Sequence, residues 1–258
     1  MRQRIVAIVP ARMASSRFPG KPLVPLLGIP MVEHVRRRAA LAEAGVDEVV
    51  VATCDVSIHD AVVAAGGRAV MTADTHERCT ERIEEASRSI DAAIIVMVQG
   101  DEPLLLPEAI GQIAAPLVAD PSVVCTNLLS PLESDEDRGN PDIVKAACAV
   151  NGDILYFSRS AIPLFRRRVD VPVYRQTGIM AFRSTLLRRY ATLPETPLER
   201  AESVDMLRLI EHGIAIRGVR VGYQTIGVDR PEHVPGVERL LREDATQRAL
   251  LERTKGAA

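Results

Sequence analysis

The expected fold rests on one stretch near the start of the chain, Ile5-Val6-Ala7-Ile8-Val9-Pro10-Ala11-Arg12-Met13-Ala14-Ser15-Ser16-Arg17-Phe18-Pro19-Gly20-Lys21. The apolar residues 5–9 predict a buried strand, and the Pro, Gly and Ser residues after them predict a loop. In an α/β sheet, a loop directly after the first strand lies in the crevice where phosphorylated ligands bind. Arg12, Arg17 and Lys21 belong to this loop, so we expect it to bind a polyanion such as a triphosphate. A solvated basic turn is the alternative.

This loop differs from the two common phosphate-binding motifs. A Walker A motif requires glycine at the position of Ser15, five residues before Gly20, and no G-x-G-x-x-G follows the strand. The missing glycines also argue against a nicotinamide oxidoreductase, which is the rival reading of an α/β enzyme.

Composition narrows the class of protein. The length of 258 residues fits one α/β domain with an insertion. A formal net charge of -2 and the absence of Trp argue against a nucleic-acid partner. No apolar run approaches the roughly 20 residues of a membrane span, so we expect no membrane association. The four cysteines form no C-x-x-C, which favours free thiols and a cytoplasmic location.

Strands and helices are expected to alternate in the first half of the chain. Strands are predicted at 5–9, 48–53, 68–71, 93–98 and 123–128, and helices at 30–45, 57–66, 80–90 and 107–119. This order predicts a Rossmann-like, doubly wound and mainly parallel α/β sheet. Between 142 and 182 the predicted strands have no helices between them. We therefore expect residues 142–212 to form a small antiparallel lobe, for acceptor binding or dimerisation, within a single domain of residues 1–258.

Two aspartates are placed at the same sheet edge as the basic loop. Asp101 follows the strand at 93–98, and Asp229 is predicted to end a further strand before the last helix. Carboxylate oxygens are ligands that Mg²⁺ prefers, so both are candidate metal ligands. Each also fits a structural role, Asp101 in a turn before Pro103 and Asp229 as a helix N-cap.

Several motifs occur in order along the chain. They are Ile8-Val9-Pro10-Ala11-Arg12, Ser15-Ser16-Arg17-Phe18-Pro19-Gly20-Lys21, Thr80-Glu81-Arg82, Val98-Gln99-Gly100-Asp101-Glu102-Pro103, Leu155-Tyr156-Phe157-Ser158-Arg159 and Gly227-Val228-Asp229-Arg230-Pro231-Glu232. In this order they resemble the cytidylyltransferases that activate 3-deoxy-manno-octulosonate (Kdo), which are close to the sialic acid cytidylyltransferases. The resemblance covers most of the chain.

The resemblance implies a reaction and a set of site residues. CMP is transferred from CTP to a small acidic acceptor, with Mg²⁺ and with release of pyrophosphate, in an enzyme that is often a homodimer. The implied catalytic residues are Arg12, Lys21 and Asp101, and the implied metal ligands are Asp101 and Asp229. The implied nucleotide-binding residues are Ala11, Arg12, Ser15, Ser16, Arg17, Lys21, Thr80, Arg82 and Gln99. The implied acceptor-binding residues are Gln99, Arg159, Arg175, Gln176, Met180 and Asp205.

The chain departs from the Kdo enzymes on the acceptor side. Where they typically read R-H-L-G-I-Y, this chain reads Arg175-Gln176-Thr177-Gly178-Ile179-Met180, and Asp205-Met206 stands in place of Glu-Gln. Fewer polar groups predict weaker recognition of sugar hydroxyls. We therefore expect a different acid, such as the phosphonate phosphonoformate, with Kdo itself as one alternative and a non-catalytic nucleotide or sugar-acid sensor as another.

One departure falls on the nucleotide side. Cys79 stands where the family usually has Gly, directly before Thr80-Glu81-Arg82. If this position requires a positive φ, a cysteine here is strained or the loop has moved.

Overall fold

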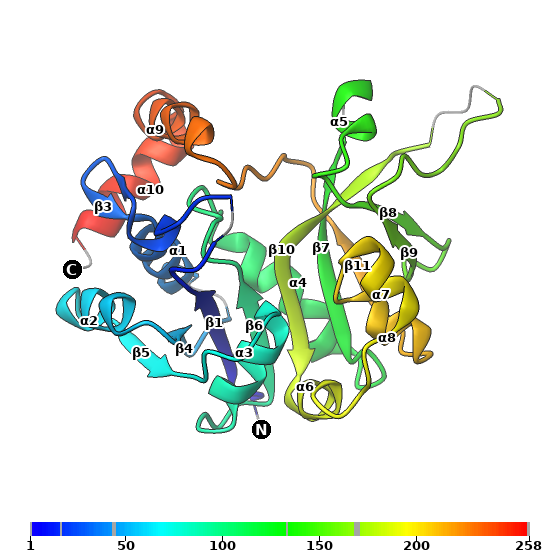
Figure 1. Cartoon of the computed structure of the whole chain (residues 1–258), viewed down its shortest axis with the longest axis horizontal. Coiled ribbons are helices and arrows are strands. Elements are labelled where there is room, and N and C mark those ends of the chain that lie inside the picture. The colour runs from blue at the N-terminus through cyan, green and yellow to red at the C-terminus, as the bar shows by residue number, and fades with distance from the viewer. Residues whose placement is uncertain (1, 16, 43–44, 133, 168–170, 257–258) are drawn as a thin grey trace. The chain divides into compact units, whose positions relative to one another are not determined.

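The computed structural model describes the chain except residues 1, 16, 43–44, 133, 168–170 and 257–258, and it is a mixed α/β protein (Figure 1). The chain forms two compact units. The first comprises Met1–Gly111 and Thr225–Ala258, and the second comprises Gln112–Gln224. The predicted lobe at 142–212 lies inside the second unit, which extends beyond it at both ends.

The first unit contains a parallel sheet with the strand order β6-β1-β4-β5. Its strands are β1 (Ile5–Ala11), β4 (Glu48–Thr53), β5 (Arg68–Met71) and β6 (Ile94–Val98), and its helices before the boundary are η1 (Lys21–Leu23), α1 (Met31–Ala40), α2 (Val56–Ala64) and α3 (Cys79–Ser87). All pairings among these four strands are parallel, which confirms the predicted doubly wound arrangement. Every residue of β1 is buried, because β1 pairs with a strand on each side and contacts α1 and α3.

The C-terminal segment completes the first unit. It consists of η2 (Pro231–His233), α9 (Val234–Glu243) and α10 (Ala245–Gly256), drawn in orange and red in Figure 1. Val237, Leu241 and Leu251 of these helices form one apolar cluster with residues that precede them in the chain. Those residues are Leu26, Met31, Leu104 and Val228. Burial of this surface attaches the end of the chain to the loop region after β1.

The prediction that a strand ends at Asp229 is wrong. Residues 223–229 contain no strand, and the segment is attached instead by one backbone hydrogen bond, from Val228 N to Asp101 O at 2.8 Å. The apolar pattern of this segment reflects burial of Val228 in the cluster rather than pairing within a sheet.

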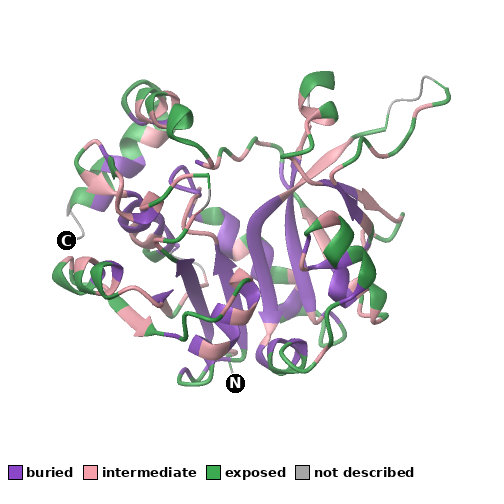
Figure 2. Cartoon of the chain, viewed as in Figure 1, coloured by how far each residue is buried: buried purple, intermediate pink, exposed green. Residues whose placement is uncertain are grey.

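The second unit is mainly antiparallel. Its strands are β7 (Cys125–Pro131), β8 (Lys145–Cys148), β9 (Ile154–Ser158), β10 (Tyr174–Arg183) and β11 (Arg217–Arg220), and its helices are α5 (Asp135–Gly139), α6 (Ser184–Tyr190), α7 (Pro197–Glu202) and α8 (Leu207–Glu211). Helix α4 (Glu108–Ala119) carries the boundary between the units. β7 pairs with β10 antiparallel and with β11 parallel, and β8 pairs antiparallel with both β10 and β9. Figure 2 shows β7 and most of β10 as buried.

The first unit also contains a short hairpin of β2 (Pro25–Leu26) and β3 (Ile29–Pro30) between η1 and α1. No helix in the described part of the chain is both long and apolar enough to cross a membrane.

Candidate active site

The basic loop after β1 folds back on itself. The backbone N–H groups of Ser15 and Gly20 both donate to Met13 O, at 2.9 and 3.0 Å. Gly20 has a φ of +75°, which lets the chain turn sharply into η1 and favours glycine at this position. The Ser15 hydroxyl accepts from Phe18 N at 3.3 Å, so this predicted nucleotide-binding side chain shapes the loop. The loop is thereby fixed before any ligand binds. Ser16 lies outside the described residues.

Two cations of the loop contact both predicted metal ligands. Lys21 Nζ lies 2.6 Å from Asp101 Oδ2 and 3.9 Å from Asp229 Oδ1, and Arg17 donates to Asp229 Oδ1 at 2.7 Å. The Lys21 side chain is only 13% exposed and that of Asp101 is 23% exposed, so water screens this pair less than a surface pair. The structure thus groups four charged residues from three separate segments of the chain, and we call Arg17, Lys21, Asp101 and Asp229 the charge cluster.

The turn after β6 places Asp101 in this cluster. Gln99 follows β6 directly, and its carbonyl accepts from Glu102 N at 3.2 Å to close the turn. A Cβ atom on Gly100 would lie 3.0 Å from Pro10 O. A side chain there would therefore push the turn away from the end of β1, which explains the glycine next to Asp101.

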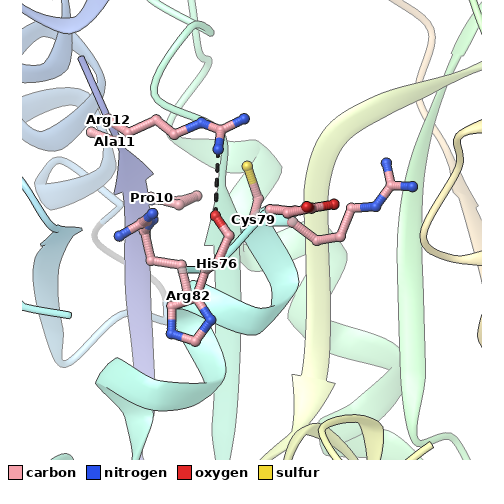
Figure 3. A pocket seen from close by; sticks show the side chains of 8 residues that line it. Pro10, Ala11, Arg12, His76, Cys79 and Arg82 are labelled. Atoms are coloured by element: carbon pink, nitrogen blue, oxygen red, sulfur yellow. Dashed lines mark hydrogen bonds between the residues drawn. The ribbon is translucent and has the colours of Figure 1, made fainter. Parts of the chain in front are cut away.

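A pocket lies beside the end of β1 (Figure 3). Its lining residues come from the end of β1 with the first loop residue, the segment directly before α3 and the start of α3: Pro10, Ala11, Arg12, His76, Glu77, Arg78, Cys79 and Arg82. Arg12 Nη1 donates to His76 O at 3.4 Å across it. The pocket therefore brings together three predicted nucleotide-binding residues, Ala11, Arg12 and Arg82.

Polar contacts hold the α3 side of this pocket. Arg82 is 3% exposed, and its Nη1 donates to Thr72 Oγ1 at 2.6 Å and to Ala73 O at 3.2 Å. Glu85 contacts His76 Nε2 and accepts from Ala73 N at 3.0 Å. Desolvation opposes ionisation of Glu85, but these hydrogen bonds outweigh it and lower the pKa of the carboxyl. Thr80, another predicted nucleotide-binding residue, is fully buried.

Cys79 is free of the backbone strain that its replacement of glycine suggested. It is the first residue of α3, and its N-cap Arg78 has a φ of −103°. Among the described residues other than glycine, only Leu27 and Ser203 have a positive φ. The position therefore accepts a side chain, and Figure 3 shows that of Cys79 at the pocket wall.

In the second unit, predicted acceptor-binding Arg159 contacts the backbone. Its Nε donates to Glu202 O at 2.7 Å and its Nη1 to Pro141 O at 3.0 Å. The Glu202 carboxylate in turn accepts from Arg159 N and from the Ser158 hydroxyl, at 2.8 and 2.7 Å. These contacts attach the end of β9 to the end of α7, which leaves the Arg159 guanidinium with few free donors.

Sequence reasoning missed Lys145, which supports Arg159. Lys145 is fully buried, and its Nζ donates to Asn140 O, Ile143 O and Arg159 O at 2.6 to 2.8 Å. Desolvation lowers the pKa of Lys145. A lysine at the start of a strand otherwise predicts an exposed side chain, so only its place within the apolar residues 143–148 could have suggested burial.

The predicted acceptor residues on β10 lie on both faces of the sheet. Arg175 and Gln176 are consecutive strand residues, so their side chains point to opposite faces. Arg175 Nε is buried and has no hydrogen-bond partner among the described residues. Gln176 Nε2 donates to Asn127 Oδ1 at 2.9 Å. Met180 pairs with Asn127 on the Gln176 face and is 2% exposed.

The remaining predicted acceptor residue, Asp205, is half-buried just before α8, where its carbonyl accepts from Arg208 N at 3.1 Å. Met206 after it is fully buried. In the part of the chain that the structure describes, no three His, Cys, Asp or Glu side chains are grouped closely enough to hold a metal ion by themselves. The predicted metal site therefore consists of two carboxylates.

A parallel α/β sheet whose first strand leads into a cationic loop, with two carboxylates beside that loop, is the arrangement of a nucleotidyltransferase. Solved structures agree on the fold: 4-diphosphocytidyl-2C-methyl-D-erythritol synthase from Anaerococcus prevotii superposes with a TM-score of 0.64 at 15% identity, over 93% of this chain and 99% of that chain.

The chain belongs to the cytidylyltransferase family, whose model matches residues 6–216. It is 44% identical to the 3-deoxy-manno-octulosonate cytidylyltransferase of Geobacter metallireducens, over 93% of this chain and 98% of the relative. It is 47% identical to the enzyme of the same name from Myxococcus xanthus, over 93% and 97%. A solved CMP:2-keto-3-deoxy-manno-octonic acid synthetase complexed with CTP has a TM-score of 0.89 at 38% identity, over 93% of this chain and 99% of that chain.

Proposed function

We propose that this cytidylyltransferase transfers CMP from CTP to Kdo and releases pyrophosphate. The observation that carries the nucleotide half is the charge cluster, in which Lys21 lies 2.6 Å from Asp101 beside the fixed loop. The observation that carries the acceptor half is 44% identity to a 3-deoxy-manno-octulosonate cytidylyltransferase over nearly the whole of both chains.

The reaction requires positioning and charge, and no covalent intermediate with the protein. An oxygen of the acceptor attacks the α-phosphorus of CTP, a new oxygen–phosphorus bond forms, and the bond to the bridging oxygen breaks as pyrophosphate leaves. Negative charge grows on the oxygens around the phosphorus and on the leaving group. In the proposal, Lys21, Arg17 and Arg12 neutralise that charge, and the pocket of Figure 3 together with Gln99 orients the nucleotide.

Asp101 and Asp229 are the proposed ligands of Mg²⁺. Two carboxylates fit this ion, because Mg²⁺ is commonly held by one or two carboxylates, waters and substrate phosphates rather than by a complete protein cage. When bound, Mg²⁺ supplies positive charge to the phosphate oxygens. Without the ion, Lys21 and Arg17 balance the charges of the two carboxylates. In the proposal, each carboxylate therefore has a positive partner whether or not Mg²⁺ is bound.

Two observations favour Kdo over a phosphonate. The two relatives described above are named as Kdo enzymes, and this chain matches them over nearly their full length. Met180 and Met206, whose presence suggested a different acceptor, are 2% and 0% exposed. As buried side chains they replace packing volume, and their thioethers need not face the acceptor. Phosphonoformate therefore becomes the second candidate.

We also propose a homodimer in the cytoplasm. β9 pairs only with β8 among the described strands, and Leu155 on it is 60% exposed. An exposed apolar side chain on a strand is a surface that a second copy can cover. All four cysteines are free thiols, which fits the cytoplasm. Light scattering tests the dimer, and Leu155→Glu is expected to shift the mass toward the monomer.

The function is tested by pyrophosphate release from CTP and Mg²⁺ with Kdo, sialic acid or phosphonoformate as the acceptor. Release with Kdo supports the proposal. Release with phosphonoformate alone contradicts the acceptor, and CTP binding without release from any acid contradicts catalysis and supports the sensor reading. Omitting Mg²⁺ from the Kdo reaction, with chelator present, is expected to stop release.

A further inference from the structure

β10 is interrupted opposite β7. Gln176 pairs with Leu129 and Met180 pairs with Asn127, so Thr177, Gly178 and Ile179 stand opposite Leu128 alone. A bulge of this kind leaves backbone carbonyl groups without ladder partners and commonly redirects a side chain. The missing partners are supplied by a side chain of β7.

That side chain is Asn127, which is fully buried. Its Nδ2 lies 3.2 Å from Leu128 O, 3.3 Å from Thr177 O and 3.2 Å from Ile179 O. Carbonyl oxygens only accept hydrogen bonds, so the amide nitrogen of Asn127 has to face them. Its Oδ1 is therefore turned toward Gln176.

The orientation of Asn127 fixes that of Gln176. Because Asn127 Oδ1 accepts, Gln176 has to present its Nε2 to it, and the two atoms lie 2.9 Å apart. The Oε1 atom of Gln176 is the other end of the same amide, and it has no partner among the described residues. It is not one of the buried unpartnered atoms either, so it is accessible. The network leaves a fixed, accessible hydrogen-bond acceptor at the start of the bulge.

From this network we infer that Asn127 is a positioning residue, and that it aims Gln176 Oε1 to accept a hydrogen bond from an alcohol of the acceptor. The inference rests on the proposed function for the place of Gln176 in the acceptor site, and it specifies the acceptor class. A polyhydroxy acid has alcohols that can donate to Oε1, whereas phosphonoformate has none. An amide that is already held in its binding orientation favours the polyhydroxy acid over phosphonoformate, because the hydrogen bond from the alcohol to Oε1 forms without rearrangement of the protein.

Two variants separate the parts of this device. Gln176→Met keeps the length of the side chain and removes the oxygen. Asn127→Leu keeps the buried volume and removes the group that orients Gln176. Asn151→Ala is the matched control, because Asn151 is an exposed residue of the β8–β9 turn in the same unit. Melting temperature is recorded for each, since Asn127 is buried.

The readouts are KM for Kdo, KM for CTP and the dissociation constant of Kdo by calorimetry. We expect Gln176→Met to raise both Kdo values about tenfold and leave KM for CTP within about twofold. Asn127→Leu raises them by a smaller factor, and it adds nothing in the Gln176→Met background because the two residues act in series. Asn151→Ala leaves all three values unchanged.

Unchanged Kdo constants in Gln176→Met would overturn the inference even if wild-type protein turns over Kdo. Equal increases in both KM values, or additive effects in the double variant, would also overturn it by showing a general loss of structure. The proposed function fails separately, if wild-type protein releases no pyrophosphate with Kdo. If another hydroxylated acid is then the acceptor, the same comparison with that acid decides the inference. Turnover of phosphonoformate alone would exclude both.

Discussion

In the first unit the predicted site residues contact one another, whereas in the second unit Arg159 and Gln176 contact backbone carbonyls or a neighbouring strand residue instead. Lys21, Asp101 and Asp229 were inferred from three separate segments, and the fold groups them within hydrogen-bond or ion-pair distance. Arg159 and Gln176 were inferred from neighbouring motifs, and both are held by local structure. The nucleotide half therefore depends on charges that the fold groups together, while the acceptor half depends on how a few polar side chains are held.

The largest expected effect breaks the charge cluster. Asp101→Asn keeps the shape of the side chain and removes the charge that Lys21 contacts and that is proposed to hold Mg²⁺. We expect kcat to fall by about 10³-fold or more, as when a main electrostatic contribution to the transition state is lost. Steady-state pyrophosphate release measures it, with Asp60→Asn as the control because the Asp60 side chain is 70% exposed on α2. A wild-type rate in Asp101→Asn would exclude the proposed role.

The next effect concerns stability and should appear only in the second unit. Arg208 forms two hydrogen bonds of 2.7 Å with Glu199, and their side chains are 7% and 0% exposed. Arg208→Met leaves the Glu199 charge buried without its ion-pair partner, which costs about 3–5 kcal/mol of the free energy of unfolding. Urea unfolding measures this loss.

The control for this variant is Arg200→Met, which removes an exposed ion pair with Glu195 in the same unit. It should change stability by less than about 1 kcal/mol. KM for CTP measured on folded Arg208→Met protein should equal that of wild type. A selective rise in that KM would show that this ion pair serves nucleotide binding rather than the fold of the second unit.

The difference between the units also explains what the sequence could predict. Parallel strands, their loops and the cations and carboxylates on those loops follow from apolar runs and the residues after them, so β1, the basic loop and Asp101 were predictable. Asp229 lies beside the basic loop, as predicted, but the predicted reason was wrong. Its segment is attached by the hydrogen bond from Val228 N to Asp101 O and does not belong to a sheet. The bulge in β10 depends on register with β7, which the pattern of a single strand does not contain. One signal was present: the polar pair Thr126-Asn127 interrupts the apolar run from Val123 to Leu129.

A smaller effect separates nucleotide from acceptor binding. Lys21→Met removes one proposed contact to the triphosphate, so we expect KM for CTP to rise roughly 10- to 100-fold, as for loss of a charged hydrogen bond. KM for Kdo should change far less. Lys255→Met is the control, since Lys255 is an exposed residue of α10 that pairs with Glu252. Equal increases in the two KM values would contradict the assignment of Lys21 to the nucleotide.

The smallest effect concerns His34, a fully buried residue of α1 that lies outside both sites. Its Nε2 donates to Leu26 O at 2.8 Å, and its buried Nδ1 has no partner among the described residues. Desolvation lowers the pKa of His34 below 6.5, the nearby Arg38 and Arg37 add to that direction, and the hydrogen bond to Leu26 and the charge of Glu33 oppose it.

Because the folded state holds the neutral form, the unfolded chain binds more protons once the pH drops below about 6.5. The contribution of His34 to stability is therefore complete above that pH and is lost as pH falls toward the lowered native value. The slope cannot exceed about 1.4 kcal/mol per pH unit for one proton. Urea unfolding between pH 7.5 and 5.5 measures it, and His34→Gln should flatten the slope while His59→Gln, at a half-buried site paired with Asp60, should not. An identical slope in wild type and His34→Gln would mean that His34 gains its proton at the same pH in the folded and unfolded states, which would contradict the lowered pKa of the buried ring.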